Sequence, residues 1–194
     1  MACAACNRNR QTKQAIATST AVESPSHRDF ASIKRQDLLN PPYLANDIKV
    51  YQEGIMRGFI QSRDFPTDKH KLIIFYPKSN TPVCETEMGA LEKWRPEFEK
   101  LGVHVLAATI DYVPTIKDWF SSEELLQDAK YPVLSSRLLP QRFGLLRSDG
   151  SLRRSSVFVM QNGEMVKMEH FDKVGRSLAE LHRMAYAYTQ DYLS

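Results

Sequence analysis

The stretch PKSNTPVCETE, residues 77–87, surrounds a cysteine with residues that suit a reactive thiolate. Cys84 follows Pro77 by seven residues and Thr81 by three, and the chain holds only two other cysteines. A thiol becomes a strong nucleophile when it ionises, and a helix N-terminus or a nearby cation lowers its pKa from about 8.5. A buried structural cysteine needs no such surroundings. The stretch therefore predicts a reactive cysteine at position 84.

The elements on either side of Cys84 are predicted to supply those surroundings. KLIIFYP (71–77) is an apolar run typical of a buried strand, and apolar residues spaced three to five apart then predict an amphipathic helix that begins near Cys84. The first turn of a helix has unpaired N–H groups and the positive end of the helix dipole, which favour an anion. Thr81 falls at the N-cap position of this helix. Pro77 ends the strand without an N–H group and is expected to shield the site from water.

A carboxylate and an arginine are expected to complete the site. Glu87 comes one turn after Cys84 on the same face of the predicted helix. Its negative charge would oppose a thiolate, so it needs a cation as a partner. The segment LRRSSVFVM offers Arg154, at the start of a strand that would lie beside the first β-α-β unit. Counting back from that strand favours Arg154 over its neighbour Arg153.

The remaining pattern predicts a mixed sheet covered by helices. The run 103–110 is a second buried strand, parallel to the first. Residues 114–126 and 175–193 predict two further helices, and an irregular turn is expected between YPVLSS and RFGLL. Two hairpins are expected, with turns at Glu53-Gly54 and Asn162-Gly163. Pro96, inside the helix that follows Cys84, predicts a kink or a break.

The chain of 194 residues suits one domain with an appended segment. Residues 1–40 are predicted to be a flexible tail and residues 41–194 the folded domain. Arg8, Arg10 and Lys13 precede the first acid, Glu23, so an organelle transit peptide is the alternative for the tail.

Composition excludes several classes of protein. The net charge of +3 is small, and most lysines and arginines are interleaved with acidic residues. Both features argue against a nucleic-acid partner. No stretch approaches the roughly 20 apolar residues of a membrane span. Three cysteines are too few for a disulfide framework. We expect a cytoplasmic protein without membrane contacts, or an organelle protein if the tail is a transit peptide.

Other kinds of chemistry have little support in the sequence. His104 alternates with valines on a core strand, so it is interpreted as a packed histidine and not as the base of a Cys-His hydrolase. Asp111 ends that strand, and because acids and histidines do not cluster around it, it is interpreted as a loop cap. No Walker, G-x-S-x-G or G-x-G-x-x-G pattern occurs.

The stretch around Cys84 resembles the active-site pattern of the peroxiredoxins, which is Pro, three residues, Thr or Ser, two residues, Cys. IDYVPTIKDWFSSEELLQDAKYPVL is similar to the segment after the second core strand in bacterial alkyl hydroperoxide reductases of this family. RSSVFVMQNG resembles the strand that begins with the family's active-site arginine, and VGRSLAEL its final helix. The resemblance covers residues 45–190. It implies an α/β protein with the thioredoxin-like fold of peroxiredoxin type, assembled as a homodimer or a higher ring.

The resemblance also implies a role for each candidate residue. Cys84 would be the peroxidatic cysteine, which attacks hydrogen peroxide or an organic hydroperoxide and becomes a sulfenic acid. Thr81 would hydrogen-bond the peroxide, and Pro77 would shield the sulfur. Arg154 would keep the thiolate ionised and stabilise the transition state, with Glu87 orienting it. The implied thiol-dependent peroxidase uses no metal, haem or flavin.

Most members of the family have a second, resolving cysteine. It lies near the C-terminus in one class and five residues after the first cysteine in another. Here YTQDYLS contains no cysteine and position 89 is Gly. The alternatives are direct reduction by an external thiol, which would be a thioredoxin-like protein or a low-molecular-weight thiol, and resolution by Cys3 or Cys6. A peroxiredoxin-like redox sensor or chaperone with little peroxidase turnover is the runner-up function.

Overall fold

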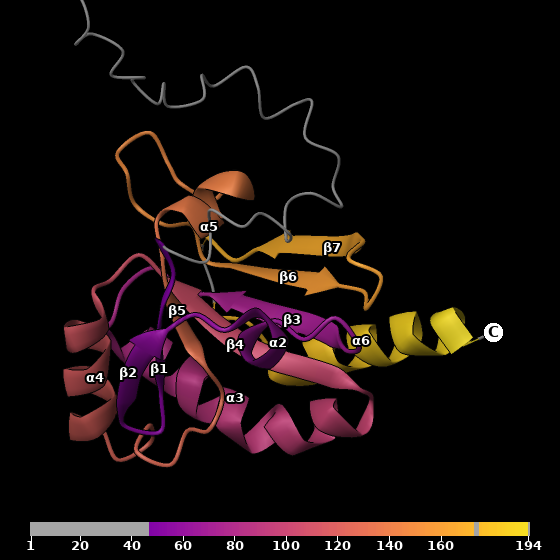
Figure 1. The fold of residues 1–194 in the computed structure, drawn as a ribbon, viewed down its shortest axis with the longest axis horizontal. Helices are drawn as coiled ribbons and strands as arrows, with labels where there is room; N and C mark the ends of the chain where they lie inside the picture. Colours follow the sequence, from indigo (N-terminus) through magenta and orange to yellow (C-terminus); the bar gives the residue numbers. More distant parts are fainter. Residues whose placement is uncertain (1–46, 173–174, 194) are drawn as a thin grey trace, which may run out of the picture. The chain divides into compact units, whose positions relative to one another are not determined.

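The computed structural model describes residues 47–172 and 175–193 (Figure 1). The predicted tail, with Cys3 and Cys6, lies outside the described residues. The described strands are β1 (Lys49–Gln52), β2 (Ile55–Gly58), β3 (His70–Phe75), β4 (Val103–Thr109), β5 (Val133–Ser135), β6 (Ser155–Val159) and β7 (Met165–His170). The helices are α2 (Gln61–Asp64), α3 (Pro82–Lys100), α4 (Val113–Ser122), α5 (Leu138–Arg142) and α6 (Leu178–Leu193).

The strands form one mixed sheet in the order β2-β1-β5-β4-β3-β6-β7. β3, β4 and β5 are parallel, and α3 connects β3 to β4, so the predicted β-α-β unit is confirmed. β6 lies antiparallel to β3 on the other side. Because the three parallel strands end at the same edge of the sheet, the loops that follow them meet there.

Both predicted hairpins are present, and local backbone geometry explains them. β1 pairs antiparallel with β2 through Glu53 and Gly54, whose φ values are 49° and 80°. Two successive residues with positive φ suit the tight turn that matches the twist of paired strands. β6 pairs antiparallel with β7, and in their turn Gly163 has a φ of 86°.

The central strand β3 is buried on both faces, as a run without polar alternation predicts. Leu72 and Ile74 belong to a hydrophobic cluster that includes side chains of α3, α4 and α6. Ile73 and Phe75 point to the opposite face, where a second cluster includes Leu139 of α5. Helices therefore cover the sheet on both sides, and α3 packs beside α6 (Figure 1).

The sequence did not predict α2, and four further elements differ from the prediction. α3 runs unbroken through Pro96, which is exposed, so its ring meets no packed neighbour and water can satisfy the freed carbonyl. α4 ends at Ser122, short of residue 126. α5 occupies the region where an irregular turn was predicted. α6 begins at Leu178 and not at residue 175, and Ser177 stands at its N-terminus, where its hydroxyl accepts the Glu180 amide and its carbonyl accepts the Leu181 amide.

Within the described ranges, each helix is too short or too polar to span a bilayer.

A buried histidine at the start of β3 should make stability depend on pH. His70 is 7% exposed, and its Nδ1 accepts a hydrogen bond from the Gln161 amide at 3.2 Å. Burial, and then the charge of Lys71, lower the pKa of His70 below its ordinary value of 6.5. The folded protein therefore resists a proton that the unfolded chain takes up. The stabilisation is present above pH ~6.5 and is lost as the pH falls toward the folded pKa.

We expect the urea midpoint of the wild type to fall between pH 7.5 and 5.5 more steeply than that of His70→Asn, whose amide oxygen replaces the acceptor but does not titrate. Equal slopes for the two proteins would show that His70 contributes nothing to the pH dependence.

Candidate active site

Cys84 lies in the first turn of α3, close to the edge where the parallel strands end. Thr81 is the N-cap and Pro82 is the first helical residue, a position that suits proline because no N–H group is needed there. The first hydrogen bond of the helix runs from the Glu85 amide to the Thr81 carbonyl at 2.9 Å. The amides before Glu85, including that of Cys84, therefore belong to the unpaired positive end of the helix.

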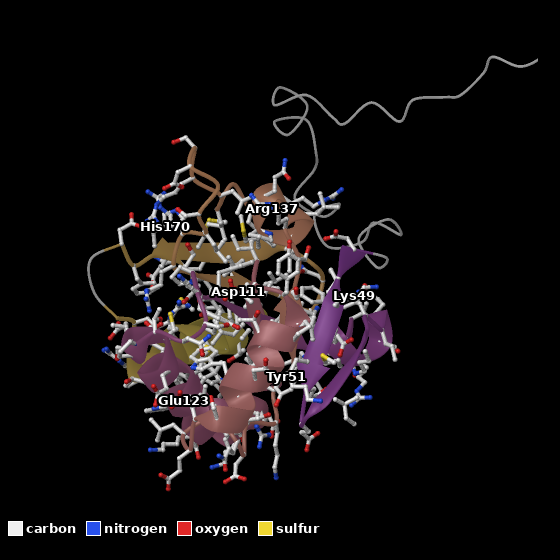
Figure 2. All side chains as sticks on the ribbon, turned by 90° about the vertical axis from the view of Figure 1, so that its left-hand side faces the viewer. Lys49, Tyr51, Asp111, Glu123, Arg137 and His170 are labelled. Carbon is white, nitrogen blue, oxygen red and sulfur yellow. The ribbon has the colours of Figure 1, made fainter. Side chains whose placement is uncertain are left out.

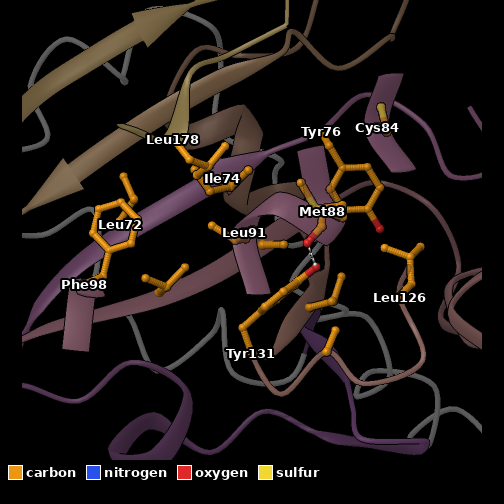
Figure 3. Close-up of a cluster of buried hydrophobic side chains, with 14 of the residues drawn as sticks. Leu72, Ile74, Tyr76, Cys84, Met88, Leu91, Phe98, Leu126, Tyr131 and Leu178 are labelled. Carbon is orange, nitrogen blue, oxygen red and sulfur yellow. Dashed lines mark hydrogen bonds between the residues drawn. The ribbon is translucent and has the colours of Figure 1, made fainter. Parts of the chain in front are cut away.

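The Cys84 side chain is fully buried and belongs to the hydrophobic cluster under α3, together with Tyr76 and Met88 (Figure 3). Removal from water disfavours a thiolate, because a charge loses its hydration. The positive end of the helix favours an anion and so offsets part of that cost. A cation close to a sulfur atom favours the charged form of a thiol.

Arg154 supplies that cation. Its Nη2 donates to the Sγ of Cys84 at 3.5 Å, and its Nη1 donates to the carboxylate of Glu87 in a short ion pair. Its carbonyl accepts the Phe171 amide at 2.9 Å, which fixes the backbone just before β6. Arg153 points elsewhere and pairs with Asp172 at 3.1 Å. The predicted pairing of Glu87 with Arg154 is thus present, and Arg153 does not reach the sulfur.

Glu87 is held between two arginines, of which only one was expected. Its second oxygen accepts the Arg176 amide at 2.8 Å and lies 3.4 Å from the Arg176 Nε. The Arg176 side chain has no exposed surface and also donates to the carbonyls of Phe75 at 2.7 Å and Ser155 at 2.8 Å. Burial lowers the pKa of Arg176 to about 10, while the Glu87 carboxylate acts in the opposite direction, so the guanidinium stays charged at neutral pH.

The sequence held one signal for Arg176, and it was missed. The residue was placed inside the predicted last helix as part of VGRSLAEL. A cation in the first turn of a helix opposes the helix dipole, so an arginine there is unfavourable unless something else binds it. That conflict could have marked Arg176 as a residue with a partner elsewhere in the fold.

Thr81 and Pro77 lie in the loop between β3 and α3. Thr81 is the N-cap, as predicted, but its hydroxyl does not cap the helix. It donates instead to the Lys78 carbonyl at 3.1 Å, within the same loop. Pro77 is half-buried and comes two residues after the end of β3. Asn80, next to Thr81, has a φ of 57°, which allows the chain to turn sharply into the helix.

Position 89, where one class of the family places its resolving cysteine, is tightly packed. A Cβ added to Gly89 would lie 3.1 Å from the Cβ and 3.3 Å from the carbonyl oxygen of Leu125. Nearby, the Tyr131 hydroxyl donates to the Met88 carbonyl at 2.9 Å (Figure 3). The segment after α4 thus packs closely against α3. A side chain at position 89 therefore has no room without movement of that segment.

The site shows no sign of a metal centre. In the part of the chain that the structure describes, no three His, Cys, Asp or Glu side chains are grouped so as to hold an ion. Cys3 and Cys6 lie outside that part.

Comparison with known proteins gives a consistent family. The model described as the AhpC/TSA family matches residues 44–168. A chloroplastic 2-Cys peroxiredoxin BAS1 from Spinacia oleracea is 27% identical over 186 residues, which cover 90% of this chain and 69% of that protein. Alkyl hydroperoxide reductase C from Mycobacterium tuberculosis is 32% identical over 145 residues, or 73% of this chain and 74% of that protein.

The crystal structure of Enterococcus faecalis AhpC superposes with a TM-score of 0.69 at 26% identity, covering 74% of this chain and 87% of that one. The predicted thioredoxin-like fold of peroxiredoxin type is therefore confirmed.

The position of Glu87 between two guanidinium groups makes a prediction about stability. Glu87→Gln keeps the shape of the side chain but leaves Arg176 buried without a counter-charge. We expect the free energy of unfolding to fall by about 3 kcal/mol in urea titrations. Glu99→Gln on the same helix is the control, because its pair with Arg95 is half-exposed and worth less than ~1 kcal/mol. Equal losses in the two variants would contradict a special role for the buried charge.

Proposed function

Since the chain belongs to the AhpC/TSA family and is a peroxiredoxin, a thiol-dependent peroxidase, we propose that Cys84 is its peroxidatic residue. The Cys84 thiolate attacks the terminal oxygen of hydrogen peroxide or an organic hydroperoxide. The O–O bond breaks as the S–O bond forms, and the sulfur becomes a sulfenic acid. The leaving oxygen takes a proton and departs as water or an alcohol. The observation that supports this assignment most strongly is the hydrogen bond from Arg154 to the sulfur.

Arg154 suits both stages of the attack. Before the reaction its positive charge offsets the desolvation of Cys84 and favours the thiolate. During the reaction negative charge moves from the sulfur to the leaving oxygen, and a fixed guanidinium beside the sulfur can follow that charge without reorganisation. Glu87 holds Arg154 in place, because Arg176 in turn holds Glu87 from the other side.

Thr81 and Pro77 are proposed to receive the peroxide. The Thr81 hydroxyl donates a hydrogen bond to the Lys78 carbonyl. The lone pairs of its oxygen are therefore left to accept a hydrogen bond from the peroxide O–H. Pro77, half-buried in the same loop, offers no N–H group that would attract water to the sulfur. Both assignments agree with the roles that the family resemblance implies.

The sulfenic acid must be reduced before a second turnover. We infer that an external thiol, from a thioredoxin-like protein or a small molecule, attacks it and releases water, and that a second thiol then frees Cys84 from the mixed disulfide. This route is supported by the glycine at position 89, which provides no resolving thiol there and is closely packed against Leu125. Resolution by Cys3 or Cys6 is the alternative, and the two-cysteine name of the spinach relative favours testing it.

The assignments for the rest of the chain follow the same reasoning. Residues 1–40 are proposed as a tail attached to the peroxiredoxin domain of residues 41–194, and the protein as a homodimer or higher ring. We propose a cytoplasmic location, with a transit peptide as the alternative that the chloroplastic name of the spinach relative supports.

Substitution at the site should separate the proposed roles. Cys84→Ser should abolish the rapid reaction with hydrogen peroxide in stopped-flow measurements. Arg154→Met should lower the second-order rate constant by about 100-fold. Arg153→Met is the matched control, because that arginine pairs with Asp172 at the surface, and its rate should stay close to wild type. A wild-type rate in Cys84→Ser would contradict the proposal.

The recycling route can be read from intact masses after one equivalent of hydrogen peroxide. If an external thiol reduces Cys84, the wild type gains one oxygen, and a Cys3→Ser/Cys6→Ser variant behaves identically. A disulfide that forms in the wild type and is lost in that variant would instead make one of the two N-terminal cysteines the resolving residue.

A further inference from the structure

Asp111 connects the ends of the three parallel strands at the edge of the sheet where Cys84 lies. It comes two residues after the end of β4 and lies above the start of α4 in Figure 2. Its carboxylate accepts the backbone amide of Ser79, in the loop after β3, at 2.6 Å. Its carbonyl accepts the hydroxyl of Ser135, at the end of β5, also at 2.6 Å. One residue thus binds loops that are far apart in sequence.

Asp111 is itself held firmly. Its amide donates to the Thr109 hydroxyl at 3.3 Å, and Thr109 is fully buried. The Thr109 carbonyl accepts the Ser136 amide at 3.0 Å, which continues the pairing of β4 with β5. A carboxylate whose own backbone is fixed on both sides is a rigid support and not a mobile surface acid.

The loop that Asp111 holds carries the residues proposed to receive the peroxide. Residues 77–81 form this loop, with Pro77 and Thr81 at its ends. The bond from Asp111 reaches Ser79, at its centre, which is 1% exposed. The next residue, Asn80, has the left-handed φ of 57°, a conformation that costs a non-glycine residue free energy unless its surroundings impose it. The anchored Ser79 amide on one side of Asn80, and the hydrogen bond from the Thr81 hydroxyl to the Lys78 carbonyl across it, restrain the backbone around this residue.

We propose that Asp111 is a positioning residue for the peroxidase reaction, which fixes the loop 77–81 through the Ser79 amide and so sets Thr81 and Pro77 against the sulfur of Cys84. The proposal rests on the proposed function of Cys84. Asp111 touches neither sulfur nor peroxide, and it acts through the backbone of its neighbour. A displacement of about 1 Å in groups that orient a substrate can lower a rate by about 100-fold, so a loosened loop should be visible in kinetics.

The first measurement compares Asp111→Ala with Asp111→Asn. The alanine variant loses the acceptor, and we expect its second-order rate constant with hydrogen peroxide to fall by tenfold or more, on the order expected for displaced orienting groups. The asparagine variant keeps an oxygen that accepts the Ser79 amide, so its rate should recover to near the wild-type value. Ser79→Ala removes the hydroxyl but leaves the amide that Asp111 binds, and it should react like the wild type.

Loss of stability must be separated from loss of positioning. Asp64 is a buried acid that pairs with Arg57 and lies close to His104, near the start of β4 and away from the Cys84 edge. Asp64→Ala should lower the melting temperature without lowering the rate constant at temperatures where the protein is folded. An equal fall in rate in Asp64→Ala and Asp111→Ala would overturn the proposal, and so would an unchanged rate in Asp111→Ala.

Hydrogen exchange tests the support of the loop without relying on peroxide chemistry. Amides of residues 79–84 should exchange faster in Asp111→Ala than in the wild type, while β7 stays unchanged. If wild-type Cys84 does not react with peroxide, the proposed function fails and the exchange data still decide whether Asp111 fixes the loop. If Cys84 reacts and neither exchange nor rate changes in Asp111→Ala, the function stands and the positioning role is wrong.

Discussion

A carboxylate buried between two guanidinium groups is the interaction on which the arrangement of the site depends. Glu87 belongs to the helix that carries Cys84, Arg154 precedes β6, and Arg176 precedes α6. Charges removed from water are tolerated only when each has a partner and its remaining hydrogen bonds are satisfied. Arg176 meets that requirement through the carbonyls of Phe75 and Ser155. The network therefore joins three segments distant in sequence, and the sulfur lies at its end.

The backbone topology supplies the second constraint. Parallel strands end at one edge of the sheet, so the loops after β3, β4 and β5 meet without any special contact. Asp111 lies at that edge, where its side chain binds the loop after β3 and its carbonyl binds the end of β5. Ion pairs fix the helix side of the site, and a carboxylate that accepts a backbone amide holds the loop side. The two sets of contacts share no residue, and they orient different parts of the same sulfur environment.

Sequence patterns predicted the framework because it depends on local regularities. Apolar runs and periodicity indicated the β-α-β unit, and the need to neutralise Glu87 indicated Arg154. The partners of Arg176, which are Glu87 and two carbonyls on distant strands, could not be identified from the patterns, nor could the hydrogen bond from the Ser79 amide to Asp111. Thr81 was placed correctly at the N-cap, but its hydroxyl turned to Lys78. Such contacts depend on tertiary arrangement, which the residue types of one segment do not encode.

Cys84 is also a member of the hydrophobic cluster that includes side chains of α3, α4 and α6. In the proposed reaction each oxygen added to its sulfur brings a polar atom among apolar side chains, where the Arg154 guanidinium is the donor that contacts the sulfur. Oxidation and unfolding are consequently linked equilibria in this domain. We expect an oxygen on the sulfur to favour more open packing unless it finds a donor within the cluster. The free energy of unfolding of the domain should therefore depend on the oxidation state of Cys84.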